Sequence, residues 1–324
     1  PREQAGRNIH YDDASLSNYK KVEQGDFIIH LRSFEGGLEM ANEAGIVSPA
    51  YTILRCKRPH SSLFYDAYFH TDEFINHNLS KSVEGIRDGR QISYEAFKWL
   101  GIPYCEPTEQ EKISTLFSAF NERIAKQRDL VESLKKYKRG VVKAIMTKQI
   151  RFVDKNGKPY PEWSACTLQD AVDFLDGQRK PLESADRAKR QGKYPYYGAS
   201  GIIDSIDDYI FDEPLILLGE DGANIINRSS PLCFIATGKY WVNNHAHVMR
   251  PHKGQNIRFL RELLESLDYT RYNTGTAQPK LNQEKCRTIP LSLPIYEEQC
   301  HIADFLAALE HKCAQENEEL EGIL

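Results

Sequence analysis

The chain of 324 residues contains no run of about 20 apolar residues. A helix that crosses a bilayer needs such a run, so the sequence excludes a membrane-spanning protein. A basic-then-apolar leader is missing as well, and the first residue is Pro1 rather than an initiator methionine. We therefore expect no secretory signal, a cytoplasmic location, no membrane partner, and a chain that is a fragment.

Cysteine pairs are also missing. The seven cysteines never occur as CxxC, which excludes a zinc knuckle and a thioredoxin-like motif. An odd number of scattered cysteines fits reduced thiols in the cytosol. The net charge of -4 argues against a uniformly basic nucleic-acid binder, although it leaves room for local basic patches.

The common catalytic motifs do not occur. GxxxxGK[ST] and GxSxG are both absent, so neither an NTPase nor an α/β-hydrolase is expected. His245 and His247 alternate along a likely strand, and with Asp221 or Glu220 they could form a metal site. Histidines satisfied by hydrogen bonds at a strand end are the better interpretation. We therefore predict no catalytic residue and no metal site.

What the sequence does contain is an internal repeat. Four segments of the first half recur in the second half at offsets of 187–189 residues: 26–31 as 214–219, 91–94 as 278–281, Ile102-Pro103 as Ile289-Pro290, and Glu109-Gln110 as Glu298-Gln299. A nearly constant offset over about a hundred residues predicts two copies of one unit. Two unrelated domains with common strand patterns are the alternative.

Each copy is expected to end in a long helix. The first is predicted to begin with Thr108 as its N-cap and to reach Gln149, a length of about 60 Å. Its apolar residues recur in steps of three and four, as in a coiled coil, at Ile113, Leu116, Phe120, Ile124, Val131, Leu134, Tyr137, Val141 and Ile145, with a gap at Gln127. The second helix is predicted from about Tyr296 to the end, with a seam at Ile302, Phe305, Leu309, Cys313, Leu320 and Ile323.

The two helices carry opposite charge. Residues 112–158 contain 13 basic and four acidic side chains, whereas residues 294–324 contain one basic and eight acidic side chains. Opposite charge favours pairing between the helices over self-pairing; two solvated faces that never meet are the alternative. At the 189-residue offset Leu324 corresponds to Lys135. The second helix therefore lacks a counterpart of residues 136–149, and both ends of the chain look clipped.

Polar loops mark the second copy as the better candidate for binding. Asn, Gln, Arg and Lys contact base edges, and Ser, Thr, Tyr and Lys also hold phosphates. A basic run between residues 179 and 193 could supply phosphate contacts. The predicted DNA-binding residues are Arg179, Lys180, Lys193, Tyr196, Tyr197, Ser200, Asn224, Arg228, Asn243, Asn244, His245, Thr276 and Lys280.

This arrangement resembles the specificity (S) subunit of type I restriction-modification systems. The resemblance covers nearly the whole chain. It rests on residues 107–113 and 294–302, which open the two helices with Glu-Gln, and on residues 163–168, 196–202, 219–223 and 275–278, which look like parts of target-recognition domains.

The resemblance implies an α+β fold with two repeated mixed α/β target-recognition domains, joined by long antiparallel coiled-coil helices. We expect a first target-recognition domain over residues 1–105, incomplete at its N-terminus, and a central coiled-coil helix over 106–150. A second target-recognition domain is expected over 151–292, followed by a distal coiled-coil helix over 293–324 that looks truncated.

The resemblance also implies a function. In this family each target-recognition domain recognises one half of a bipartite site in double-stranded DNA, and the helices dock methyltransferase (M) subunits. S-adenosylmethionine, ATP and Mg would belong to those subunits and to the motor-nuclease (R) subunits, so the chain itself would have no active site and no cofactor. The alternatives are a coiled-coil interaction scaffold, or an inactive truncated remnant without specific DNA binding.

Overall fold

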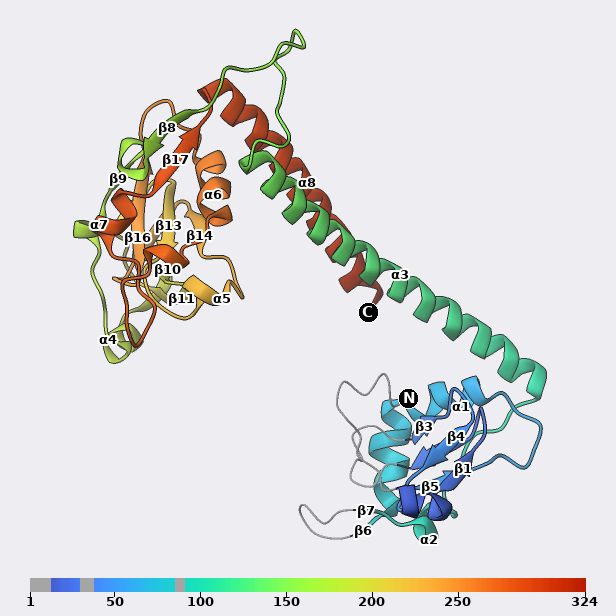
Figure 1. Cartoon of the computed structure of the whole chain (residues 1–324). Coiled ribbons are helices and arrows are strands. Elements are labelled where there is room, and N and C mark those ends of the chain that lie inside the picture. Colours follow the sequence, from blue (N-terminus) through green and yellow to red (C-terminus); the bar gives the residue numbers. More distant parts are fainter. Residues whose placement is uncertain (1–12, 30–37, 85–90) are drawn as a thin grey trace. The chain divides into compact units, whose positions relative to one another are not determined.

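A computed structural model describes residues 13–29, 38–84 and 91–324 (Figure 1). Residue contacts divide the chain into unit 1, residues 1–126, and unit 2, residues 127–324. Helix α3 (Pro107–Met146) contributes residues to both units. Short sheets and helices alternate within each unit, which confirms the predicted α+β class.

Unit 1 is built around a three-stranded antiparallel sheet. Its central strand β2 (Phe27–Ile29) pairs with β3 (Leu38–Met40) and β5 (Thr52–Leu54). Helix α1 (Ser62–Phe69) packs Tyr65 and Phe69 into the core of this sheet. The last two residues of the repeated segment 26–31, His30 and Leu31, lie outside the described residues.

The other described elements of unit 1 are short. They are η2 (Asp13–Asn18), β1 (Lys20–Val22), β4 (Gly45–Val47), η3 (Glu73–Asn78), η4 (Leu79–Ser82), β6 (Val83–Glu84), β7 (Gln91–Ile92) and α2 (Tyr94–Phe97).

Unit 2 contains two four-stranded sheets, in the strand orders β14-β13-β16-β9 and β11-β10-β15-β12. All five residues of the central strand β13 (Leu215–Gly219) are buried. Successive side chains of a strand point to opposite faces, and here the two faces enter different cores. Leu215 and Leu217 pack with Tyr240, whereas Ile216 and Leu218 pack in the larger core that includes α6.

The elements of unit 2 other than α3 and β13 follow in chain order. They are β8 (Ser164–Thr167), η6 (Leu168–Asp170), β9 (Val172–Phe174), η7 (Asp176–Gln178), α4 (Ser184–Lys189), β10 (Gln191–Gly198), β11 (Gly201–Ile206), β12 (Phe211–Asp212), α5 (Asn224–Asn227), β14 (Cys233–Ala236), β15 (Lys239–Val242), β16 (Ala246–Pro251), α6 (Ile257–Ser266), η8 (Thr270–Tyr272), α7 (Gln283–Arg287), β17 (Pro290–Leu293) and α8 (Tyr296–Ile323).

The repeat predicted from sequence is visible in the sheets. Strands β2 and β13 occupy corresponding positions, because each is central and each has the next strand of the chain on one side, β3 and β14 respectively. Both also pair with a later strand on the other side, β5 and β16. The offset of 188 residues therefore connects segments with the same place in the topology.

The repeat also appears in the hydrogen bonds that attach the long helices. Gln110 Oε1 accepts from the backbone N–H of Ser61 at 2.9 Å, and Gln299 Oε1 accepts from the N–H of Asn256 at 2.8 Å. Ser61 and Asn256 are the N-caps of α1 and α6. The side-chain Nε2 of each glutamine donates to the backbone carbonyl five residues earlier. Each Glu-Gln motif thus attaches its long helix to a second helix of the same unit.

The ends of α3 differ slightly from the prediction. Pro107 rather than Thr108 opens the helix, and the carbonyl of Glu106 accepts from the N–H groups of Glu109 and Gln110. Proline is favoured at a first helical position because its missing N–H would be unpaired there. The helix ends at Met146, before the predicted Gln149, because Lys148 adopts a left-handed φ of 61° and closes the carbonyl end.

Helix α8 pairs antiparallel with the later part of α3. Gln127 contacts Glu316, and further along α3 Lys138 forms an ion pair with Glu310 at 3.1 Å. The predicted α8 is confirmed at Tyr296–Ile323. Apolar residues of both helices, among them Val141, Ile145, Ile302 and Leu306, belong to one core.

The seam itself is only partly as predicted. Val131, Val141 and Ile145 are buried on α3, and Ile302 is buried on α8. In contrast, the predicted seam residues Leu116, Phe120 and Tyr137 are more than half exposed, and on α8 Leu306 is buried where Phe305 was expected. Adjacent helical positions differ by only 100°, so the apolar pattern did not decide between Phe305 and Leu306.

Candidate nucleic-acid interface

Three loops of unit 2 meet at the end of strand β13. The Glu220 N–H donates to the carbonyl of His245 at 2.8 Å, and the Leu281 N–H donates to the carbonyl of Glu220 at 2.7 Å. Gly222 N–H also donates to the carbonyl of Pro279 at 3.0 Å. Backbone hydrogen bonds therefore join the loops around residues 219–222, 243–247 and 273–281 into one surface.

A buried group of charges lies directly beneath this surface. His247 Nδ1 is 2.7 Å from Asp176 Oδ2, and its Nε2 is 2.9 Å from the carbonyl oxygen of Leu281. Both neighbours only accept hydrogen bonds, so both ring nitrogens carry protons. Burial disfavours the charged ring, but the hydrogen bonds and charges of Asp176 and Cys286 together outweigh it and raise the pKa of His247 to about 10. Burial likewise opposes ionisation of Asp176, while His247 holds the pKa of that carboxyl below its ordinary value.

This group of charges also bears on the metal site that was considered for His245 and His247. Ligand atoms of Asp176, Glu220 and His247 lie within 4.8 Å of one another. A metal-binding histidine must offer an unprotonated nitrogen, and His247 has none free, while Arg179 contacts both carboxylates. His245 is not part of this group: it is half exposed and pairs with Asp221. The two histidines that the sequence placed on one side therefore have different surroundings.

Two predicted DNA-binding arginines are engaged inside the protein. Arg179 Nη1 donates to Glu220 Oε2 and to the carbonyl of Ala246, both at 2.7 Å, and its side chain is only 13% exposed. Arg228 has a left-handed φ of 50°, and its guanidinium binds the carboxylate and the carbonyl of Glu265. Both side chains hold loops in place rather than presenting free positive charge.

Three further predicted residues also support the loops. Tyr196 is fully buried, and its hydroxyl accepts from the Leu182 N–H at 2.9 Å. Tyr197 stacks on Phe234. The Asn224 amide accepts from the Ser230 N–H at 3.0 Å and donates back to the Ser230 carbonyl.

The remaining predicted residues are more accessible. Asn243 is buried apart from 5% of its surface, but it lines a surface cavity. His245 is half exposed. Six are exposed: Lys180, Lys193, Ser200, Asn244, Thr276 and Lys280. Lys280 lies beside Asp221 in an isolated β-bridge, and its Nζ is 3.2 Å from Glu220 Oε1.

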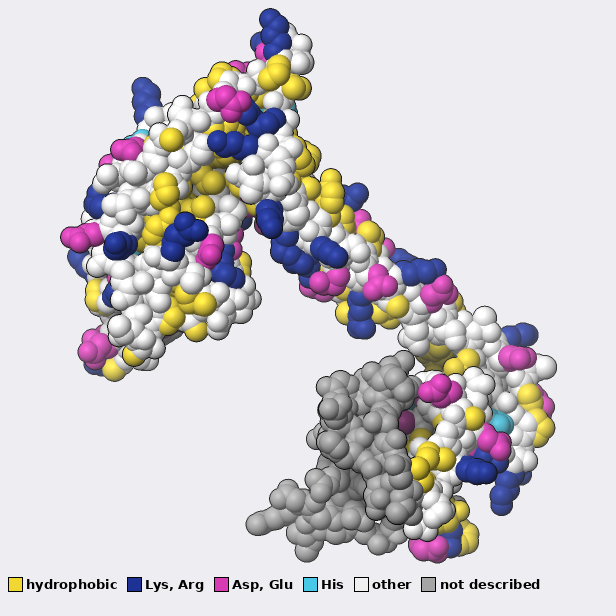
Figure 2. Space-filling model, viewed as in Figure 1, with side chains coloured by type: hydrophobic (Ala, Val, Ile, Leu, Met, Phe, Trp, Pro, Cys, Tyr) yellow, Lys and Arg dark blue, Asp and Glu magenta, His cyan; other side chains and the backbone are white. Residues whose placement is uncertain are grey.

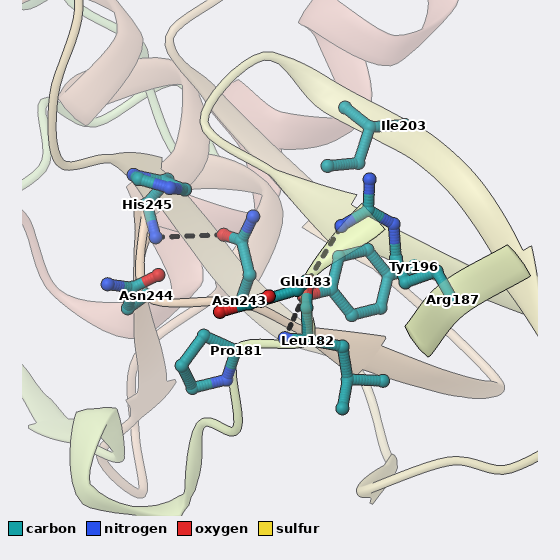
Figure 3. Close-up of a pocket in the computed structure, with 9 residues that line it drawn as sticks. All are labelled: Pro181, Leu182, Glu183, Arg187, Tyr196, Ile203, Asn243, Asn244 and His245. Carbon is teal, nitrogen blue, oxygen red and sulfur yellow. Dashed lines mark hydrogen bonds between the residues drawn. The ribbon is translucent and has the colours of Figure 1, made fainter. Parts of the chain in front are cut away.

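A cavity of about 540 Å³ opens beside these loops (Figure 3). Residues of the β15–β16 turn form one side of it, and the segment before α4, α4 itself, β10 and β11 form the other. Its lining residues are Pro181, Leu182, Glu183, Arg187, Tyr196, Ile203, Asn243, Asn244 and His245. The sequence prediction missed Pro181, Leu182, Glu183 and Ile203. Arg187, which also lines the cavity, belongs to the basic run that the sequence assigned to phosphate contacts.

Comparison with known proteins places this geometry in a family. A family model for the type I restriction modification DNA specificity domain matches residues 160–324, which is half of the chain. The chain belongs to this family. The match includes all of the loops and the cavity described above, and α8 as well.

Individual specificity subunits are similar over shorter or more divergent stretches. A putative type I restriction enzyme specificity subunit from Haemophilus influenzae is 32% identical over 148 residues, which cover 46% of this chain and 37% of that protein. The chain thus spans little more than a third of this curated relative. The crystal structure of the S subunit from M. genitalium has a TM-score of 0.60 at 16% identity, covering 93% of this chain and 80% of the other. The HsdS subunit from Thermoanaerobacter tengcongensis has a TM-score of 0.52 at 16% identity, covering 92% and 76%.

The specificity fold is therefore shared over most of the chain. In the stretches that the structure describes, none of the helices combines the length and the apolar character needed to cross a bilayer.

Proposed function

We propose that this chain is a DNA sequence-specificity subunit of a type I restriction-modification complex, and that unit 2 recognises one half of the DNA target. The observation that supports this most directly is the loop surface at the end of β13. Its buried charges pair with one another, through Asp176, His247, Arg179 and Glu220. The exposed polar side chains around them remain available for a polar ligand.

The contacts of this surface divide by their chemistry. Exposed lysines at Lys180 and Lys193 suit phosphates, which fix the register of a protein on DNA without carrying sequence information. Asn243, Asn244 and His245 suit base edges, because they offer hydrogen-bond donors and acceptors in one turn. Arg179, Arg228, Tyr196, Tyr197 and Asn224 act as supports for this surface in the proposal.

The long helices suit a spacer and a docking surface in the same proposal. Recognition of a bipartite target requires two binding units at a fixed separation, and residues 1–105 and 151–292 would serve as the two target-recognition domains. Exposed apolar side chains recur on α3 at Leu116, Phe117, Phe120, Leu130 and Tyr137. Figure 2 shows hydrophobic, basic and acidic side chains interspersed along the long helices. Such a surface would dock methyltransferase subunits.

In this proposal the methyltransferase and motor-nuclease subunits carry out the catalysis. S-adenosylmethionine would be bound by the methyltransferase subunits, and ATP and Mg by the motor-nuclease subunits that join the complex. The chain itself would contribute recognition without a cofactor or a catalytic residue.

The decisive experiment is a map of methylated DNA in cells that carry this gene with a methyltransferase subunit of the same system, compared with cells that lack this gene alone. A bipartite methylated motif that disappears on deletion supports the proposal and gives both half-sites. A palindromic motif indicates that two copies of one functional unit recognise the site. An unchanged methylation pattern contradicts the proposal and favours a scaffold or an inactive remnant.

A further inference from the structure

The cavity beside the loop surface contains a polar group without a partner. Asn243 is 95% buried, and its Oδ1 accepts from the His245 N–H at 2.8 Å. This bond fixes which end of the amide is the oxygen. None of the described residues provides a hydrogen-bond partner for its Nδ2. Figure 3 shows the Asn243 amide standing between His245 and the side of the cavity formed by Tyr196 and Ile203.

Although most of the Asn243 side chain is covered, Nδ2 is not one of the fully buried unpartnered atoms of the described residues, so an acceptor that enters the cavity can reach it. Because Oδ1 already accepts from the His245 N–H, Asn243 can offer a ligand in the cavity only its Nδ2 donor. A ligand that fits must therefore place an acceptor opposite Nδ2.

His245 adds a hydrogen-bond acceptor beside the donor of Asn243. Its Nδ1 is 2.7 Å from Asp221 Oδ2. A carboxylate can only accept a hydrogen bond, so Nδ1 carries the proton, and in the neutral ring Nε2 is an acceptor. Within the described part of the chain Nε2 has no hydrogen-bond partner, and the ring lines the cavity. Asn243 and His245 thus offer one donor and one acceptor from a single turn.

Among the four bases, this pair matches the major-groove edge of adenine. Adenine presents the N7 acceptor beside the N6 donor, whereas guanine presents two acceptors, N7 and O6. The apolar side chains Leu182 and Ile203 also line the cavity. They suit the methyl group of the thymine that pairs with adenine.

We propose that Asn243 and His245 bind the N7 and N6 groups of one adenine in an A·T pair of the target half-site. This inference rests on the proposed function. Asp221 is a positioning residue for this contact, because it holds the proton on His245 Nδ1. The two side chains determine the base at a single position, and the exposed lysines contribute no base preference.

The test is selection of DNA from a random library by the full chain and by its complex with the methyltransferase subunits. Wild-type protein is expected to select a motif with one invariant A·T pair that depends on this site. His245→Arg replaces the acceptor by donors and is expected to change that position to G·C while leaving the other positions unchanged. The change in preference should be roughly tenfold to a hundredfold.

His252→Arg is the matched control. His252 also pairs with a carboxylate, with Nε2 at 3.1 Å from Asp173 Oδ1, but it lies outside the cavity lining. The DNA motif selected by the His252→Arg protein should equal the motif selected by the wild type. A second variant, Asn243→Asp, keeps the oxygen that accepts from His245 and removes the Nδ2 donor. With 7-deazaadenine at the invariant position, which lacks N7, wild-type affinity should fall while the Asn243→Asp protein is insensitive.

Each outcome decides the inference. A wild-type motif that His245→Arg leaves unchanged overturns the adenine contact and leaves the proposed function intact. Wild-type protein that enriches no sequence, alone or in the complex, overturns the proposed function and the adenine contact together.

Discussion

Gln127 on α3 and Glu316 on α8 are hydrogen-bonded to each other, and they stand 189 residues apart in the sequence, which is the offset between the two Glu-Gln motifs. Gln127 Nε2 donates to the Glu316 carbonyl at 2.9 Å and to its Oε2 at 2.8 Å. In an antiparallel pair of equivalent helices, a residue faces its own equivalent only at the local two-fold axis. The gap in the apolar seam at Gln127 is therefore the place where the two copies of the helix meet at corresponding positions.

Replacement of Gln127 by Ala is expected to lower the free energy of unfolding of unit 2 by about 1–2 kcal/mol, because one bond to a charged group and one to a backbone carbonyl are lost. Chemical denaturation would measure this change. Gln149→Ala is the control, since Gln149 is exposed beyond the end of α3. An equal effect of the two substitutions would show that the interhelical bond contributes nothing.

The glutamines of the two Glu-Gln motifs allow a test on each unit separately. Gln299→Ala leaves the buried Gln299 site without its bonds to Asn256 and to the Pro294 carbonyl. We expect a loss of about 2–3 kcal/mol, confined to unit 2. Gln110→Ala should produce the corresponding loss in unit 1. Hydrogen exchange resolved along the chain would locate both effects, and loosening of the opposite unit in either variant would contradict the assignment.

His247 makes the stability of unit 2 depend on pH. Its pKa is about 10 in the folded protein and near 6.5 in the unfolded chain. The stabilisation is therefore fully present below pH 6.5 and is lost as the pH rises toward 10. Urea unfolding at several pH values should show the free energy of unfolding falling across this window. In His247→Gln protein this part of the pH dependence should be absent, and in His252→Gln protein it should remain.

Lysines proposed to contact phosphates have a different signature from residues that contact bases. Lys180→Ala and Lys193→Ala should each weaken DNA binding for all sequences alike. Each should also reduce the slope of log affinity against log salt concentration by about 1. Lys155→Ala, in the turn between α3 and β8, is the comparison. A changed target motif in either lysine variant would mean that its side chain contacts a base.

Much of the architecture could be predicted from the sequence, because it depends on regular spacing. The repeat, the position of α8 and the fold class followed from offsets and from apolar periodicity. The roles of the arginines could not be predicted in the same way. Arg179 and Glu220 are 41 residues apart, so nothing in the local pattern indicated that an ion pair at 2.7 Å removes this charge from the surface. The buried hydroxyl bond of Tyr196 was hidden for the same reason, since its partner Leu182 lies on a separate segment.

In the candidate site, too, the local composition was predictable from the sequence and the long-range contacts were not. The polar turn at Asn243, Asn244 and His245 was recognisable from its composition, and the structure brings these residues to one cavity. Asp221, which fixes the His245 ring, was considered in the sequence only as a possible metal ligand beside the two histidines. Its role depends on the backbone bonds between the loops, and these form only in the folded sheet.

The attachment of the long helices has a consequence for how specificity can evolve. Gln110 and Gln299 bind the backbone N–H groups of Ser61 and Asn256 rather than side chains of the loops around β13. Under the proposed function, a change in the loops around β13 would leave these helix attachments the same. A new target sequence would then arise by recombination within one unit, without any compensating change in the helices.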